Sequence, residues 1–278
     1  MNFMIHGINN DFLYAVTHLR VQFAKGINKK VFEGSGFFIK KEQNIYLITN
    51  RHVVDLEYKD SENKYCSYHI DEVFFDARRF DKTNNKSVTK TYKINTFSHE
   101  FAADPYDDIA CIYNINVHGD IILTPVTIPY DMLADSDFIS QKLMSCDKVA
   151  LIGFPAGVWD VHNNLPILRS GVISSDPRLD FNNDHNYSGH VIGYEAFSTG
   201  GASGSPVFAL QKGFPLGGAL KAPDDFYRET KLIGINASSV HIGDSHQHMS
   251  LMYKSDQIRS LIDHCEEMLF VTAPATKA

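Results

Sequence analysis

The chain has 278 residues, of which 44% are hydrophobic and 21% charged, the composition of a folded globular protein. Its 33 acidic residues outnumber its 26 basic residues and give a formal net charge of −7 at pH 7. Proteins that bind phosphate backbones usually carry a basic excess, so we expect no nucleic-acid partner. No run approaches the roughly 18 apolar residues of a membrane span, so we also expect no membrane partner.

The cysteines and the N-terminus bear on the compartment. The four cysteines are widely spaced and include no Cys-x-x-Cys pair: Cys66, Cys111, Cys146 and Cys265. This pattern fits neither a disulfide framework nor a cysteine zinc site, and it predicts free thiols. Residues 1–16 lack the basic region, apolar run and cleavage site of a secretory signal. We therefore expect a cytoplasmic protein.

Short runs rich in Val, Ile, Phe and Tyr dominate the chain, with Gly, Asn, Asp and Pro clusters between them. This pattern predicts an all-β fold. In chain order the predicted strands are 14–23, 36–40, 45–49, 72–75, 109–115, 149–154, 167–173, 191–197, 206–210 and 232–236. A short helical turn is expected near 130–133. Apolar residues at helical spacing predict a C-terminal helix over 256–270, with Ser255 as its N-cap.

Three segments hold residues with chemical potential. They read Gly34-Ser35-Gly36-Phe37 followed by Thr49-Asn50-Arg51-His52-Val53, then Asp107-Asp108-Ile109-Ala110, and finally Gly200-Gly201-Ala202-Ser203-Gly204-Ser205-Pro206. Taken singly, each has an ordinary structural interpretation. The last segment could be a tight turn, and as a phosphate-binding loop it lacks the Lys-Ser/Thr pair and a following helix.

Taken together, the segments supply the parts of nucleophilic serine catalysis. That chemistry needs a hydroxyl, a histidine base and a carboxylate that orients the base, here Ser203, His52 and Asp108. It also needs backbone N–H groups that hold the oxyanion, and neighbouring glycines leave room for them. Gly201 and Ser203 would form this oxyanion hole. Asp107 is a rival carboxylate and Ser205 a rival hydroxyl.

The first of these segments holds two motifs, so the three segments contain four. The four motifs resemble those of the trypsin-like (chymotrypsin-fold) serine peptidase family, in particular its bacterial members such as the HtrA/Deg proteases. The family pattern is Gly-x-Gly-Phe, Thr-x-x-His-Val, Asp-Ile/Leu-Ala and Gly-x-Ser-Gly-x-Pro, in that order, and the match spans residues 12–262. The resemblance favours Asp108, because the family's aspartate directly precedes Ile/Leu-Ala. It disfavours Ser205, which stands where relatives usually have glycine.

The resemblance implies two six-stranded antiparallel β-barrels with the active site between them. We expect an N-terminal barrel over 1–117, a connector over 118–146, a C-terminal barrel over 147–253, a helix over 254–270 and a tail over 271–278. Ala202 departs from the family, whose secreted members carry an aspartate there that pairs with a freed N-terminal amine. We therefore do not expect activation by that route.

The resemblance also locates a substrate pocket. Its base would be Phe197, six positions before the nucleophile, and one wall would be Ala237, Ser238 and Ser239. Because Phe197 is not a carboxylate, we expect no preference for Lys or Arg. His241, His246 and His248 could bind zinc, but their spacing is unspecific and a solvated loop is the simpler interpretation. We expect no metal and no cofactor.

These observations predict a serine endopeptidase whose partner is a protein or peptide substrate. A compact protease in the cell needs restraint, so we expect narrow specificity or an activating partner. The alternative is a binding or scaffolding protein that keeps the fold and is catalytically silent.

Overall fold

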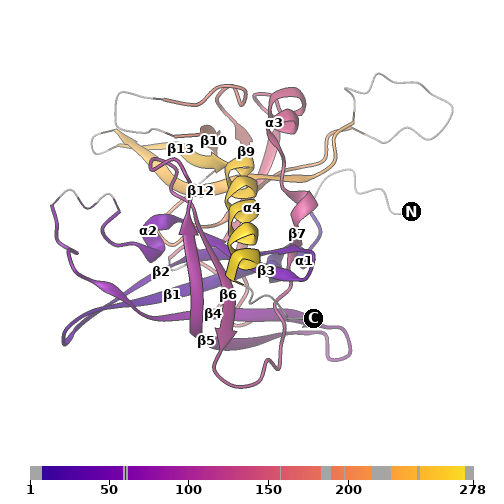
Figure 1. Cartoon of the computed structure of the whole chain (residues 1–278). Helices are drawn as coiled ribbons and strands as arrows, with labels where there is room; N and C mark the ends of the chain where they lie inside the picture. The colour runs from indigo at the N-terminus through magenta and orange to yellow at the C-terminus, as the bar shows by residue number, and fades with distance from the viewer. Residues whose placement is uncertain are drawn as a thin grey trace.

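The computed structural model describes residues 8–58, 60, 62–156, 158–182, 189–196, 198–213, 227–242 and 245–272, with no description of the side chains at 238–242, 245–248 and 270–272. It consists mainly of antiparallel strands in two halves, packed together with a C-terminal helix (Figure 1). No helix within those ranges is both long enough and apolar enough to cross a membrane.

The N-terminal half forms a ring of strands in the order β1-β4-β5-β6-β3-β2, closed by pairing of β1 with β2. Its strands are β1 (Val16–Lys25), β2 (Asn28–Lys41), β3 (Asn44–Thr49), β4 (His69–Asp81), β5 (Lys86–Phe101) and β6 (Ala110–Val117). A short seventh strand, β7 (Ile128–Pro129), pairs parallel to β2. We call this half the ring.

The ring has the six mutually antiparallel strands expected for the N-terminal half, but it departs from an even barrel. Besides the parallel β7, its strands pair over unequal lengths. Residues 73–81 of β4 pair with β5, whereas β1 pairs with β4 only over residues 69–74. The far end of the β4–β5 hairpin therefore extends past its neighbours, and the ring is not evenly round an axis.

The C-terminal half confirms the expected closed six-stranded barrel, with strand order β10-β13-β12-β11-β8-β9. Its strands are β8 (Lys148–Gly153), β9 (Ile167–Ile173), β10 (Val191–Glu195), β11 (Pro206–Ala209), β12 (Lys231–Ile242) and β13 (Ser245–Lys254). We call this half the barrel. Between the halves lie the 3₁₀ turn η1 (Tyr130–Met132), close to the predicted turn, and the helix α3 (Ser136–Lys142).

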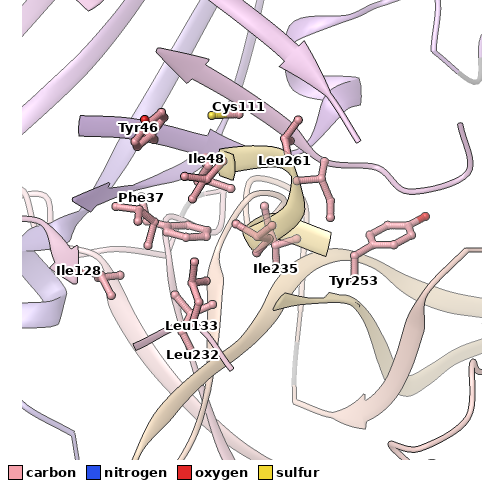
Figure 2. Packing of buried hydrophobic residues seen from close by; sticks show 14 of the residues in the cluster. Phe37, Tyr46, Ile48, Cys111, Ile128, Leu133, Leu232, Ile235, Tyr253 and Leu261 are labelled. Atoms are coloured by element: carbon pink, nitrogen blue, oxygen red, sulfur yellow. The ribbon is translucent and has the colours of Figure 1, made fainter. Parts of the chain in front are cut away.

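The helix α4 (Ser255–Thr272) confirms the C-terminal helix and packs against both halves. In Figure 1 it runs from the barrel strands above to the ring strands below. Figure 2 shows Phe37 and Ile48 of the ring, Ile235 of the barrel and Leu261 of α4 in one apolar cluster. Ser255 is the first residue of the helix, and its hydroxyl donates to the Ala134 carbonyl at 2.8 Å instead of capping.

Polar contacts reinforce this apolar interface. Arg78 of the ring is fully buried, pairs with Asp76 at 2.7 Å and donates from Nε to the carbonyl of Asn164 in the C-terminal half at 2.6 Å. Burial lowers the pKa of Arg78 to about 10, partly offset by Asp76. A small helix, α1 (Asp11–Ala15), precedes β1 and adds Ala15 to the shared core. The two halves are therefore joined by one continuous core.

The shared core generates a stability prediction. Ile262 of α4 has no exposed surface, so Ile262→Ala should lower the free energy of unfolding by about 2–5 kcal/mol, measured by urea denaturation. Glu267→Ala on the exposed face of the same helix should change it by less than about 0.5 kcal/mol. Equal effects of the two substitutions would show that α4 does not pack into this core.

Candidate active site

His52 lies in α2 (Arg51–Val54), a single helical turn directly after β3. Asn50, which is fully buried, donates from its side chain to the backbone carbonyl of Asp108 at 2.6 Å. Arg51 points elsewhere, stacking over the rings of Tyr58 and Phe101 and pairing with Asp55. The start of α2 is thus fastened to the loop that carries the predicted carboxylate.

Asp108 contacts His52 with both carboxylate oxygens. Oδ2 lies 2.6 Å from Nδ1 of the imidazole, and Oδ1 accepts the backbone N–H of His52 at 2.9 Å. The Asp108 side chain is 4% exposed and that of His52 36%. A proton donated from Nδ1 leaves Nε2 as the acceptor nitrogen, which is the tautomer a general base requires. The structure therefore brings this predicted pair together.

Ser203 lies on the loop between β10 and β11, and that loop is fastened to β2 of the ring. The Ser35 N–H donates to the Ser203 carbonyl at 2.7 Å. The Ser35 hydroxyl accepts the Phe154 N–H at 2.9 Å and donates to the Gly201 carbonyl at 3.0 Å. Gly204 has φ +84°, and a Cβ there would lie 1.9 Å from the Ser35 carbonyl oxygen. Only glycine allows this approach.

The same approach brings Ser203 near α2. A Cβ at Gly34 would lie 3.0 Å from Cγ2 of Val53 and 3.4 Å from the Ser203 carbonyl oxygen. Ser203 Oγ itself donates to the Ala237 carbonyl at 3.3 Å. No hydrogen bond joins it to His52 in the described part of the chain. In this structure the Ser203 hydroxyl is therefore directed to the Ala237 carbonyl and not to His52.

The two predicted oxyanion donors are available. Neither the Gly201 N–H nor the Ser203 N–H donates a backbone hydrogen bond to any residue that the structure describes. Because contacts with Ser35 hold the loop in place, these N–H groups can bind developing negative charge without reorganising. The predicted donors lie on the loop that Ser35 fastens.

Asn236, on β12, supports the loop, a role that the sequence did not indicate. Its side chain donates to the Ala202 carbonyl at 2.9 Å and accepts the Tyr194 hydroxyl at 2.6 Å. Its backbone N–H donates to the Ser205 carbonyl, and its carbonyl accepts the Gly204 N–H. Asn236 is 1% exposed. The buried side-chain amide of Asn236 therefore holds the loop, although residue 202 is an alanine and not an acidic residue.

The rival residues have other surroundings. Ser205 is fully buried, and its hydroxyl has no hydrogen-bond partner among the described residues. Asp107 accepts from His190: Oδ2 lies 2.8 Å from Nδ1 of the imidazole, and Oδ1 accepts the backbone N–H at 2.8 Å. The His190 side chain is 38% exposed and is paired with Asp107.

Among the described residues, three side chains of types that can bind metals lie close together, Asp104, Asp107 and His190, but Asp107 and His190 are hydrogen-bonded to each other. Ala237 is 7% exposed, on β12. Phe197 and the side chains of Ser238 and Ser239 lie outside the described residues. So do the side chains of His241, His246 and His248.

Comparison with known proteins gives a family and a fold. A variant of the HtrA-type protease AlgW with a bound tripeptide superposes with a TM-score of 0.54 at 17% identity, over 92% of this chain and 61% of that chain. AlgW with a tripeptide gives 0.52 at 18% identity, over 93% and 61% of the two chains. The chain thus spans about three fifths of those proteases. Curated protein sequences give no significant match.

The family model that matches is the trypsin-like peptidase domain, over residues 34–217. This range begins at Gly34, at the first of the four motifs, and continues past Ser203 and Pro206, at the last. It covers more than half of the chain. The chain therefore belongs to the trypsin-like peptidase family.

Proposed function

We propose that the protein is a serine endopeptidase in which Ser203 is the nucleophile, His52 the general base and Asp108 the carboxylate that orients it. The observation that carries the proposal is the double contact of Asp108 with His52, beside the loop that holds Ser203. The contact directs Nδ1 to the carboxylate and leaves Nε2 for the hydroxyl.

The proposed reaction has two halves. Ser203 Oγ forms a bond to the carbonyl carbon of the scissile peptide while His52 Nε2 takes the hydroxyl proton. The N–H groups of Gly201 and Ser203 bind the oxyanion. The C–N bond then breaks, and His52 returns the proton to the leaving amine. Water attacks the acyl-enzyme with the same proton transfers, releasing the acid and restoring Ser203.

The substrate class follows from the family and from the relatives. HtrA-type AlgW has been captured with a tripeptide and with a decapeptide. We propose that this chain likewise binds an extended peptide, along β12 next to Ala237. Since position 197 is Phe, uncharged side chains of small or medium size are expected in the pocket, rather than Lys or Arg.

The resting position of the nucleophile supports restrained activity. Ser203 Oγ donates to the Ala237 carbonyl, on the strand proposed to bind the substrate. A substrate or an activating partner that changes this contact would release the hydroxyl toward His52. A catalytically silent scaffold is the competing function, and the next experiment separates the two.

Labelling with a fluorophosphonate probe tests the nucleophile. The wild type should form a covalent adduct, and Ser203→Ala and His52→Ala should form none, because the probe needs an activated hydroxyl. Ser205→Ala is the matched control. Its hydroxyl is buried without a described partner, so labelling should persist. No labelling of the folded wild type, with or without candidate peptides and cell lysate, would favour the scaffold.

Replacing the carboxylate tests the orienting role of Asp108. Asp108→Asn keeps the shape but presents an amide N–H to His52 Nδ1, which favours the wrong imidazole tautomer. The labelling rate should fall by about 10³–10⁴-fold. It is measured by quenching the reaction at set times and reading the fluorescence of the labelled protein on a gel. A fall of less than about tenfold would exclude Asp108 as the orienting carboxylate.

Removing the Ser35 hydroxyl tests the support of the oxyanion loop. Ser35→Ala leaves the Phe154 N–H and the Gly201 carbonyl without this partner, so the free energy of unfolding should fall by about 1–3 kcal/mol. Labelling should also slow, because the Gly201 peptide loses its anchor. The control, Ser260→Ala on the exposed face of α4, should change neither quantity. Unaltered labelling in folded Ser35→Ala would show that the hydroxyl does not hold the loop.

A further inference from the structure

Two adjacent aspartates hold two histidines from different halves of the molecule in the same way. Asp108 receives Nδ1 and the backbone N–H of His52, which follows β3 of the ring. Asp107 receives Nδ1 and the backbone N–H of His190, which directly precedes β10 of the barrel. The segment 107–108 therefore connects the proposed catalytic base to the barrel.

The Asp107–His190 contact is closely built. Asp107 is fully buried. Gly189 has φ +100°, and a Cβ there would lie 2.5 Å from Asp107 Oδ1 and 3.1 Å from Cε1 of Tyr253. The His190 carbonyl accepts the Lys254 N–H of β13 at 2.9 Å, which fixes the histidine backbone to the barrel. A chance surface ion pair needs neither the glycine nor the buried carboxylate.

We propose that Asp107 and His190 form a clasp between the ring and the barrel. The clasp positions Asp108, and through it His52, against the barrel that carries Ser203. This role rests on the proposed function. Neither residue touches the reacting atoms, so both are positioning residues. The turn itself transmits the position, because the Ile109 N–H donates to the Asp107 carbonyl at 2.9 Å and the Asp107 N–H donates to the Asp104 carbonyl at 3.1 Å.

His190, a titratable member of the clasp, has charged residues around it. From the 102–109 loop, Asp104 lies 4.0 Å from Nδ1 of His190. Asp180, in the segment before β10, pairs with Lys254 at the end of β13. Burial alone lowers the pKa of His190, but the hydrogen bond and charge of Asp107, with Asp180 and Asp104, raise it above the usual 6.5.

The stabilisation that His190 contributes to the clasp is greatest at low pH. Burial raises the pKa of Asp107 as well, and the hydrogen bonds and charge of His190 offset only part of that rise. Both groups therefore hold a proton more tightly in the clasp. The stabilisation from the raised pKa of His190 is complete below pH 6.5 and is lost as the pH rises through the folded-state value.

The first test measures fluorophosphonate labelling of the full chain. His190→Ala removes the donor to a buried carboxylate and should slow labelling by about 10–100-fold. His190→Asn places an amide N–H near the position of Nδ1 and should restore most of the rate. Asp104→Asn is the matched control, since it removes a neighbouring charge without removing a hydrogen bond of the clasp, and it should stay within about twofold of wild type.

A pH profile separates positioning from packing. In Asp107→Asn the amide N–H can donate to neutral His190 but opposes the protonated imidazole. The rate of this variant relative to wild type should therefore fall by about tenfold as the pH drops from 8.5 to 6. A flat ratio, or no rescue by His190→Asn in a protein with wild-type melting temperature, would overturn the clasp.

The second test needs no catalysis. In Ser203→Ala protein, proton NMR should show a sharp downfield resonance from His52 Nδ1–H, bound to Asp108. His190→Ala should broaden that resonance and His190→Asn should retain it. A sharp resonance that is unaltered by His190→Ala overturns the clasp. Wild type that fails to label while the resonance still depends on His190 overturns the proposed function alone, because the clasp then positions His52 without catalysis.

Discussion

The backbone contact between Ser35 and the loop 201–205 is the constraint on which the rest of the site depends. It joins a ring strand to a barrel loop at hydrogen-bonding distance, 2.7 Å between the Ser35 nitrogen and the Ser203 oxygen. So close an approach leaves no room for a side chain at position 204. The Ser35 hydroxyl then ties the Gly201 carbonyl to the Phe154 N–H, and Asn236 holds the other side of the loop.

The acidic pair Asp107-Asp108 illustrates how one turn can serve two tasks. Both carboxylates are almost fully buried, and each is matched to a histidine that supplies two hydrogen-bond donors. Buried carboxylates are costly unless they are paired in this way. The arrangement distributes one carboxylate to His52, on the ring, and one to His190, beside the barrel. It thereby links the geometry of the proposed base to the packing of the two halves.

Much of this site was predictable from local sequence, because its glycines and its His, Asp and Ser lie in short motifs with few conformational choices. The partner of Asp107 was not, since His190 lies 83 positions away in the chain, in a polar loop. The strands β5 and β13 were also missed. β5 reads as polar, and among its residues Tyr92 and Ile94 are buried. Its pairing with β4 and β6 on either side makes it a strand although its own sequence lacks a hydrophobic pattern.

A crystal structure of the fluorophosphonate adduct tests the central claim most directly. We predict a bond from phosphorus to Ser203 Oγ, a phosphonyl oxygen within about 2.7–3.1 Å of the Gly201 and Ser203 nitrogens, and His52 still paired with Asp108. An adduct on another residue would contradict the account. So would an adduct on Ser203 whose oxygens point away from both N–H groups.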